Sequence, residues 1–224
     1  FKIPIVSGNV SFYNETNGLS IYPTPMLGMV GLIESVDKTM TQWFREDDDD
    51  IILLGATRED LGGSEYLKVL HSREQGSPPY LNLDQEQAVQ HCVLELIRAG
   101  LVQSAHDCSD GGLAVALAEC CMSGPDQSRG AVVRLTPGRQ RKDSMLFGES
   151  QSRIIVSAKP AQRQAILEQA QRLGVPAGVI GAVGGASLVI YLGDEGSTTK
   201  TIDLPVATIA DRWGYSLERK LSQE

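Results

Sequence analysis

The chain has 224 residues, of which 42% are hydrophobic and 21% charged, and its formal net charge is −8 at pH 7. This composition suits a globular protein, and the acidic balance argues against an extended nucleic-acid surface. No apolar run approaches the ~18 residues that span a bilayer. The first residues, Phe1–Val6, lack a Met and a signal-peptide pattern, so we expect a piece of a longer cytoplasmic protein. Four cysteines without ligand spacing predict buried thiols, at Cys92, Cys108, Cys120 and Cys121.

The first part of the chain predicts a loop-rich start followed by two strands. Residues 1–25 are rich in Asn, Gly, Thr and Pro, which is typical of loops. The apolar run Met26–Val36 predicts a buried strand, and Ile51–Gly55 predicts a second one. The acidic run Asp47–Asp50 predicts a solvated loop, because consecutive carboxylates cannot converge on one metal ion without severe backbone strain.

Helical periodicity begins after the second strand. A short helix is predicted at 64–73, and a longer one from Asp84, as N-cap, to Gly100, as C-cap. Further strands are predicted at 103–106, 131–135, 153–158, 179–183 and 187–192. Further helices are predicted at 113–122, 160–174 and 206–221. The Gly184-Gly185 pair between the last two strands predicts a hairpin.

Strands and helices therefore alternate through most of residues 26–224. This order predicts an α/β sandwich, in which helices pack against a mixed sheet. The chain contains neither an internal repeat nor a low-complexity linker.

The first candidate site is the segment around Gly8. Gly8 would let a ligand approach the backbone closely, and Asn9 offers an amide oxygen, a hard ligand suited to Mg²⁺. Ser11 would face the same side as Asn9 if the segment is extended. Segments of this composition are common in ordinary loops, so a loop without a ligand stays open as the alternative.

The second candidate lies between a predicted strand and a predicted helix. Glycines at a helix start leave N–H groups unpaired at the positive end of the helix dipole, which suits phosphate or carboxylate. The alternative is that Asp110 serves only as an N-cap. His106, Asp107 and Ser109 are too close in sequence for a hydrolase triad, whose members usually come from separate elements. The segment comprises Asp107, Ser109, Asp110, Gly111 and Gly112.

Two further polar segments lie directly before a predicted strand and a predicted helix. Glu149, Ser150 and Gln151 stand at the mouth of the strand that begins at Arg153, where side chains can reach a ligand at the sheet edge. Leu61–Ser64 contains a second glycine pair before a helix. Each of these signals is weak by itself.

Taken together and in order, the segments resemble the large-subunit family of phosphoribosylformylglycinamidine synthase, over essentially the whole chain. The resemblance rests on five motifs at similar separations. They are SGNVSFYNET (7–16), PTPMLGMVGLIE (23–34), LGGSEYL (61–67), HDCSDGGLAVALAE (106–119) and FGESQSRIIVS (147–157).

The resemblance implies a domain organisation. Members of this family consist of two similar halves, each with an ATP-binding domain and a domain like the C-terminal domain of aminoimidazole ribonucleotide synthetase. Residues 1–35 would then be the tail of the second ATP-binding domain, and residues 36–224 the second C-terminal domain. The family fold of the latter is an α/β sandwich, which agrees with the pattern above.

The resemblance also implies a reaction. The family joins formylglycinamide ribonucleotide, ATP and ammonia from glutamine into formylglycinamidine ribonucleotide, ADP and phosphate, with Mg²⁺ offsetting charge on the transferred phosphoryl group. Residues that match the family pattern would bind ATP (Gly8), Mg²⁺ (Asn9) and substrate (Ser11). The family's catalytic histidine lies upstream of Phe1, so we assign no catalytic residue here and expect the chain to be inactive alone.

The family's Glu-Ser-Gln motif contacts substrate in the first half, whereas Glu149, Ser150 and Gln151 belong to the second. These residues and the segment 107–112 are therefore candidates for an anion site or an auxiliary nucleotide site. Expected partners are the missing N-terminal domains, a glutaminase subunit and a small accessory subunit, with no nucleic acid and no membrane. Two alternatives stay open: a non-catalytic scaffold module, and a related kinase or synthetase of the same superfamily.

Overall fold

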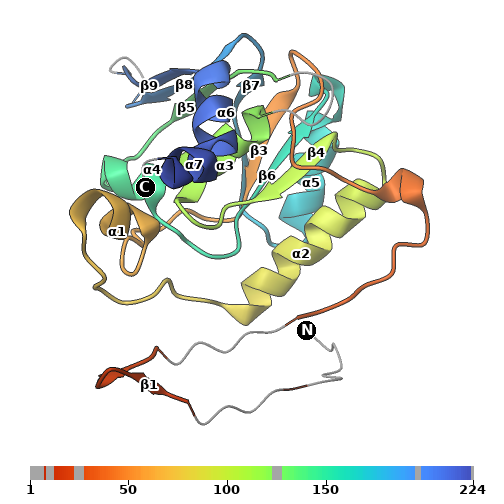
Figure 1. Cartoon of the computed structure of the whole chain (residues 1–224). Coiled ribbons are helices and arrows are strands. Elements are labelled where there is room, and N and C mark those ends of the chain that lie inside the picture. Colours follow the sequence, from red (N-terminus) through yellow and green to blue (C-terminus); the bar gives the residue numbers. More distant parts are fainter. Residues whose placement is uncertain (1–7, 9–12, 23–27, 123–127, 195–197, 223–224) are drawn as a thin grey trace.

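The computed structural model describes residues 8, 13–22, 28–122, 128–194 and 198–222. Its centre is a seven-stranded mixed sheet with helices on both faces (Figure 1), in the strand order β4-β6-β3-β7-β5-β8-β9. The strands of this sheet are β3 (Asp50–Leu54), β4 (Ser104–Asp107), β5 (Ala131–Leu135), β6 (Ile154–Ala158), β7 (Ala177–Val183), β8 (Ser187–Leu192) and β9 (Thr199–Pro205). Neighbouring strands are antiparallel except β5 and β8, which are parallel. The predicted α/β sandwich is confirmed.

The helices are α1 (Glu65–His71), α2 (Leu83–Arg98), α3 (Gly112–Cys121), α4 (Lys142–Phe147), α5 (Arg163–Arg172), α6 (Val206–Gly214) and α7 (Ser216–Leu221). Helices α1 to α5 lie in connections between strands, and α6 and α7 follow the last strand. Short 3-10 turns lie at Val36–Lys38 and Pro160–Gln162, and a small hairpin joins β1 (Glu15–Thr16) to β2 (Leu19–Ser20). No helix in the described ranges is long and apolar enough to cross a membrane.

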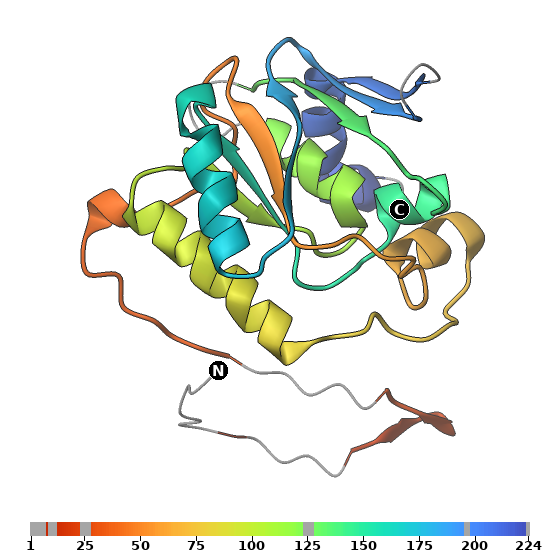
Figure 2. The ribbon, with the colours of Figure 1, turned by 180° about the vertical axis from the view of Figure 1, so that it is seen from behind.

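The sheet separates two hydrophobic cores, because successive side chains of a strand point to opposite faces. Ile51 packs in the core that contains Leu117 of α3, whereas Ile52 packs in the core that contains Leu96 of α2 and Ile166 of α5. Figure 2 shows α2 and α5 in front of β3 and β6, with α3 and α6 behind the sheet. Cys92, Cys108, Cys120 and Cys121 are buried free thiols, as predicted.

The predicted hairpin between β7 and β8 is wrong. β5 lies between these two strands, antiparallel to β7 and parallel to β8. The Gly184-Gly185 turn instead wraps around the residue before β5: the nitrogen of Gly184 donates to the carbonyl of Gly130, and the nitrogen of Gly130 donates to the carbonyl of Gly185. The glycine pair correctly indicated a turn. The insertion of β5 between β7 and β8 depends on pairing between distant segments, which no local pattern encodes.

The predicted buried strand at Met26–Val36 is also wrong for its described part. Residues 28–35 form no strand, and their large side chains are exposed, with Leu32 at 95% and Val30 at 101% of the reference area. Figure 1 shows this stretch outside the sandwich, beyond α2. An apolar run becomes a strand only when another strand pairs with its backbone, and none of the described strands does so.

Several boundaries differ from the predictions. The N-cap of α2 is Asn82, not Asp84: its side chain accepts hydrogen bonds from the nitrogens of Asp84 (3.0 Å) and Gln85 (3.1 Å). The acidic run is not wholly solvated, because Asp49 and Asp50 are buried at the start of β3. The predicted last helix is interrupted at Tyr215, and α4 and β9 were not predicted.

Candidate functional site

Gly8 is the described part of the first candidate segment. It is exposed, and a Cβ built on it would meet no atom within 4 Å. Asn9 and Ser11 lie outside the described residues. Among the residues that the structure describes, none therefore forms a ligand-binding wall beside Gly8.

The second and third candidate segments meet at one cleft of about 290 Å³. Its walls come from the loop between β4 and α3, the loop before β6, and the first half of α2. It is lined by Glu86, Val89, Asp107, Cys108, Ser109, Asp110, Glu149, Gln151, Ser152, Arg153 and Ile154. Most of the predicted residues therefore lie together here, whereas Gly111, Gly112 and Ser150 do not line the cleft.

Glu149 occupies the backbone donors that the sequence had suggested for a ligand. Its Oε1 accepts hydrogen bonds from the nitrogens of Gly111 (2.8 Å) and Glu65 (2.9 Å), at the starts of α3 and α1. The negative carboxylate is well placed there, because both helix dipoles are positive at these ends. An internal side chain thus fills part of the predicted anion site.

The two glycines at the start of α3 have steric roles. Gly111 is the N-cap, with φ of 77°, so Asp110 does not cap the helix. Gly112 has φ of 69°, and a Cβ there would lie 2.4 Å from the carbonyl oxygen of Gly148. Position 112 needs glycine so that α3 can approach the loop that carries Glu149, whereas a Cβ at Gly111 would lie 2.5 Å from the Val115 side chain of the same helix.

Two buried side chains, Ser150 and Arg153, anchor the loop before β6 that carries Glu149. Ser150 is buried, and its hydroxyl contacts the backbone nitrogen (3.0 Å) and oxygen (3.3 Å) of Arg58. Arg153 is 2% exposed and donates to the carbonyls of Gly148 (2.6 Å) and Ser150 (3.0 Å) and to the hydroxyl of Thr57 (3.2 Å). Burial lowers the pKa of this guanidinium. The Ser150 hydroxyl therefore connects the loop before β6 to the backbone of Arg58.

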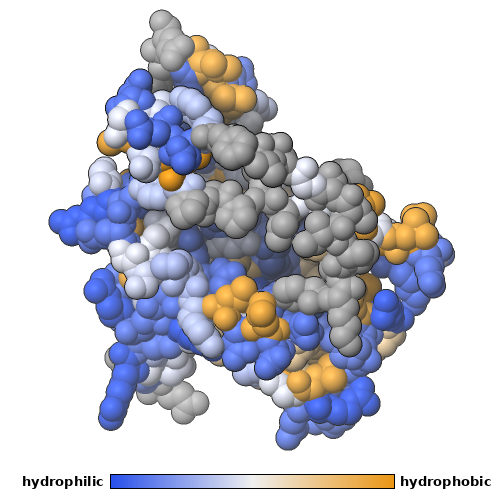
Figure 3. Space-filling model, turned by 90° about the horizontal axis from the view of Figure 1, so that it is seen from below, coloured by the Kyte–Doolittle hydropathy of each residue, from blue (hydrophilic) through white to orange (hydrophobic). Residues whose placement is uncertain are grey.

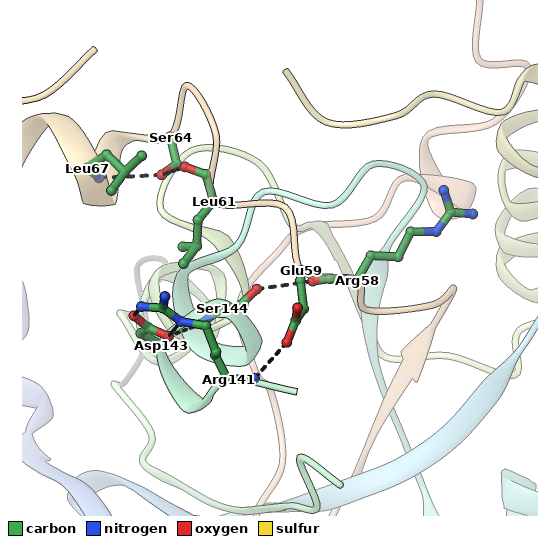
Figure 4. A network of polar contacts seen from close by, with 8 residues as sticks. All are labelled: Arg58, Glu59, Leu61, Ser64, Leu67, Arg141, Asp143 and Ser144. Carbon is green, nitrogen blue, oxygen red and sulfur yellow. Dashed lines mark hydrogen bonds and ion pairs between the residues drawn. The ribbon is translucent and has the colours of Figure 1, made fainter. Parts of the chain in front are cut away.

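A neighbouring polar network fixes the segment after β3 to α4 (Figure 4). The backbone nitrogen of Arg141 donates to the Glu59 carboxylate (2.9 Å), and the Ser144 hydroxyl donates to the carbonyl of Arg58 (3.4 Å). The Ser64 hydroxyl caps α1 by accepting from the nitrogen of Leu67 (3.4 Å). This network holds the backbone of Arg58 under Ser150.

The arrangement of His106 excludes a hydrolase triad at this loop. Its Nε2 lies 2.8 Å from Oε2 of Glu119, and its Nδ1 lies 3.6 Å from Oδ1 of Asp107. The Ser109 hydroxyl donates to Asp107, not to the imidazole. In a triad, the Ser109 hydroxyl would have to be hydrogen-bonded to the His106 imidazole, which would act as its base.

Sequence reasoning missed Glu86, which lines the cleft from the first turn of α2 and accepts a hydrogen bond from the Ser152 hydroxyl (2.6 Å). Nothing in its local sequence distinguishes it from any glutamate on an amphipathic helix. Within the described part of the chain, no three His, Cys, Asp or Glu side chains are grouped to hold a metal ion.

Comparisons with known proteins identify the family. The family model described as "AIR synthase related protein, C-terminal domain" matches residues 46–192. The phosphoribosylformylglycinamidine synthase subunit PurL of Anaeromyxobacter sp. (strain Fw109-5) is 49% identical over 217 residues, which cover 94% of this chain and 27% of that protein. PurL of Moorella thermoacetica is 49% identical over 216 residues, which cover 96% and 28%. The chain therefore spans little more than a quarter of these relatives.

Solved structures agree in fold. Thermotoga maritima PurL complexed with FGAR superimposes with a TM-score of 0.65 at 23% identity, covering 78% of this chain and 30% of that one. The hydrogenase maturation protein HypE has a TM-score of 0.50 at 17% identity, covering 76% and 57%. The chain belongs to the family of AIR synthase related C-terminal domains and is related to a portion of PurL, the phosphoribosylformylglycinamidine synthase.

Proposed function

We propose that the chain is the C-terminal part of an ATP-dependent ligase that converts formylglycinamide ribonucleotide, ATP and ammonia into formylglycinamidine ribonucleotide, ADP and phosphate in the cytoplasm. The observation that carries this proposal is the 49% identity to PurL over 94% of the chain. ATP would phosphorylate the amide oxygen, and ammonia would displace the phosphate. The chain alone would be inactive, because the family's catalytic histidine is expected outside it.

The proposed contribution of this chain to the catalytic site is the segment around Gly8. Gly8 would contact ATP, Asn9 would supply an oxygen ligand to Mg²⁺, and Ser11 would contact the substrate. An amide oxygen suits Mg²⁺ chemically. The metal would offset the charge of the transferred phosphoryl group.

Residues 1–35 are proposed to belong to a preceding ATP-binding domain, and residues 36–224 to a separate C-terminal domain. Support comes from the exposed apolar side chains of Met29, Val30, Leu32 and Ile33, which a neighbouring domain would cover. Figure 3, which shows the molecule from below, displays hydrophobic residues in separate small groups among hydrophilic ones.

The residues Asp107, Ser109, Asp110, Gly111, Gly112, Glu149, Ser150 and Gln151 are proposed to form or support an auxiliary nucleotide site. Glu149 already fills two backbone donors, and the cleft is lined by carboxylates. A nucleotide would therefore need an accompanying cation to enter. If the site stays empty in the parent protein, these residues serve as a scaffold, which is the competing function.

The proposed partners are a glutaminase subunit and a small accessory subunit. A structure of PurLQS from Thermotoga maritima is similar in fold to this chain, with a TM-score of 0.59 at 22% identity. A third candidate, a kinase or synthetase of the same superfamily, would share the fold without this level of sequence identity.

Calorimetric titration of the chain with Mg·ATP, and separately with formylglycinamide ribonucleotide, tests its share in recognition. Micromolar binding to the folded chain, lost in Asn9→Ala for Mg·ATP and in Ser11→Ala for the ribonucleotide, supports a preformed site. Absence of binding, together with full activity of an Asn9→Ala parent enzyme at every Mg²⁺ concentration, would overturn the proposed metal role.

A further inference from the structure

The tip of the hairpin that joins β1 to β2 is an exposed Asn-Gly turn. Asn17 has φ of 53° and Gly18 has φ of 77°, between the paired residues Thr16 and Leu19. Positive φ at both central residues is typical of a type I′ turn, for which Asn-Gly is a preferred sequence. Figure 1 shows the hairpin outside the sandwich, beyond α2. Water therefore has access to both residues of the turn.

The two groups that can react at this turn are the side-chain amide of Asn17 and the backbone nitrogen of Gly18. In the ranges that the structure describes, no hydrogen bond involves either group. A Cβ built on Gly18 would meet no atom within 4 Å, so neighbouring groups do not shield the nitrogen. Attack of this nitrogen on Cγ of Asn17 closes a succinimide ring, and glycine has no Cβ to obstruct the approach.

The hairpin is too small to hold the turn in one conformation. β1 and β2 have two residues each, and the Leu19 side chain is 74% exposed. A further backbone hydrogen bond, from the nitrogen of Ile21 to the carbonyl of Asn14 (3.0 Å), extends the pairing. A two-stranded hairpin without a buried face is marginally stable in water. Opening of the hairpin therefore gives the Gly18 nitrogen the freedom to reach Cγ of Asn17.

The second Asx-Gly pair of the sequence, Asp110-Gly111, is held differently. The nitrogen of Gly111 donates to Oε1 of Glu149 (2.8 Å) at the start of α3. While Glu149 holds this nitrogen, it cannot attack the neighbouring Asp110 carboxyl group. The amide of Asn82 is also held, because its oxygen accepts from two nitrogens at the start of α2. Hydrogen bonding thus distinguishes Asn17 from these two positions.

We propose that Asn17 is a site of spontaneous deamidation, with water as the co-reactant. The Gly18 nitrogen loses its proton to hydroxide and bonds to Cγ of Asn17. The bond from Cγ to Nδ2 breaks, and the amide nitrogen takes a proton from water and leaves as ammonia. Water then opens the ring: cleavage of the new bond to Cγ gives aspartate, and cleavage of the original peptide bond gives isoaspartate. The proposal does not depend on the ligase function.

The products change the hairpin. Both carry a carboxylate in place of a neutral amide, which adds one negative charge at neutral pH. In isoaspartate the backbone passes through the side-chain carbon, so the loop between Thr16 and Leu19 is longer by one atom. The length of a hairpin loop fixes the register of its strands. The Thr16–Leu19 pair is therefore lost when isoaspartate forms.

The test incubates the folded 224-residue chain at mildly alkaline pH and maps its peptides by mass spectrometry, with isoaspartyl methyltransferase labelling to detect isoaspartate. Asn17 should convert at least about tenfold faster than Asn14 or Asn82. Asn14 is a reference because the side chain of Glu15 crowds the nitrogen that follows it. A synthetic peptide of residues 13–22 gives the rate without tertiary structure, and the chain should react within about tenfold of that rate.

Two substitutions separate the chemistry of the turn from a general effect on the chain. Gly18→Val should slow conversion of Asn17 at least about tenfold, because a β-branched side chain obstructs the attack. Gly138→Val is the matched control, since Gly138 is also exposed, has φ of 57° and would meet no atom within 4 Å of a Cβ. It should leave the rate at Asn17 unchanged. Urea unfolding verifies that each variant retains the fold.

Four results would overturn the proposal. The first is conversion of Asn17 no faster than that of Asn14, and the second is an equal rate in the chain and its Gly18→Val variant. The third is deamidation of the peptide while Asn17 of the chain stays intact, because the turn would then protect the amide. The fourth is isoaspartate at Asp110 as fast as at Asn17, because hydrogen bonding of the glycine nitrogen would then not decide the site.

Discussion

The Oε1 atom of Glu149 lies 2.8 Å from the backbone nitrogen of Gly111, at the start of α3. The same oxygen accepts from the nitrogen of Glu65, at the start of α1. One carboxylate therefore joins two helix ends that are far apart in sequence to the loop before β6. Because Glu149 also lines the cleft, these two hydrogen bonds fix the position of one of its walls.

Replacement of Glu149 by alanine should destabilise the fold by about 2 kcal/mol, because two partly buried N–H donors lose a charged acceptor. Glu149→Gln retains an oxygen acceptor and should cost less. Urea unfolding measures both. The control Glu168→Ala removes an exposed glutamate on α5. If Glu149→Ala is no more destabilising than this control, the junction does not hold the helices.

Glycine at position 112 should be required for more than its positive φ. Gly112 and Gly174 both have φ of 69°, but a Cβ at Gly112 would lie 2.4 Å from the carbonyl oxygen of Gly148, whereas one at Gly174 would meet nothing within 4 Å. Gly112→Ala should therefore exceed Gly174→Ala in destabilisation by about 1–3 kcal/mol, the cost of overpacking. Equal unfolding free energies for the two variants would contradict the close approach of α3 to the loop.

The structure and the sequence prediction assign different N-cap residues to α2, Asn82 and Asp84 respectively. Asn82→Ala should cost about 1 kcal/mol of stability, because it removes the acceptor for two helix-start nitrogens. Asp84→Ala, which alters the residue that the sequence had suggested, should cost about 0.5 kcal/mol or less, through the helix dipole alone. Chemical unfolding of both variants decides, and the reverse order would contradict the described start of α2.

Asp49 should make stability depend on pH. It is buried, its Oδ2 has no hydrogen-bond partner in the described residues, and burial, followed by the charge of Glu46, raises its pKa to about 6. A raised pKa means that the folded state binds the proton more tightly than the unfolded state. Stability is therefore lost as pH rises from about 4 to about 6.

The loss would be at most ~3 kcal/mol, and screening by solvent reduces it to ~1 kcal/mol. Asp49→Asn cannot ionise, so its unfolding free energy should lack this decline. Parallel unfolding curves at pH 4, 5, 6 and 7 give the comparison. If the difference between the variant and the parent is constant over this range, Asp49 does not titrate as its burial requires.

Local patterns predicted much of the fold. Ile51 and Ile52 were identified as strand residues, and Ser64 as the start of a helix, because apolar periodicity and capping residues are local signals. The position of β5 between β7 and β8 could not be predicted, since it depends on pairing between distant segments. The apolar run near Leu32 was misassigned because hydrophobicity alone does not supply a pairing partner.

For the candidate cleft too, local patterns identified some of the residues, whereas long-range packing determined the others. Asp107, Asp110 and Glu149 were singled out because polar residues between a strand and a helix are typical of sites, and they do lie together. No local pattern indicated that the Glu149 carboxylate would accept a hydrogen bond from the nitrogen of Gly111. Glu86 was missed because its contribution arises only when α2 packs beside the loop before β6.

The most direct test of the proposed ligase function is a chimera, in which this chain replaces the matching segment of the Anaeromyxobacter PurL relative. The measurement is ADP release that depends on formylglycinamide ribonucleotide and ammonia. We predict activity within about tenfold of the unmodified relative, since the two segments are 49% identical, and no activity from the chain alone. A folded chimera without activity, beside an active unmodified relative, would contradict the proposal.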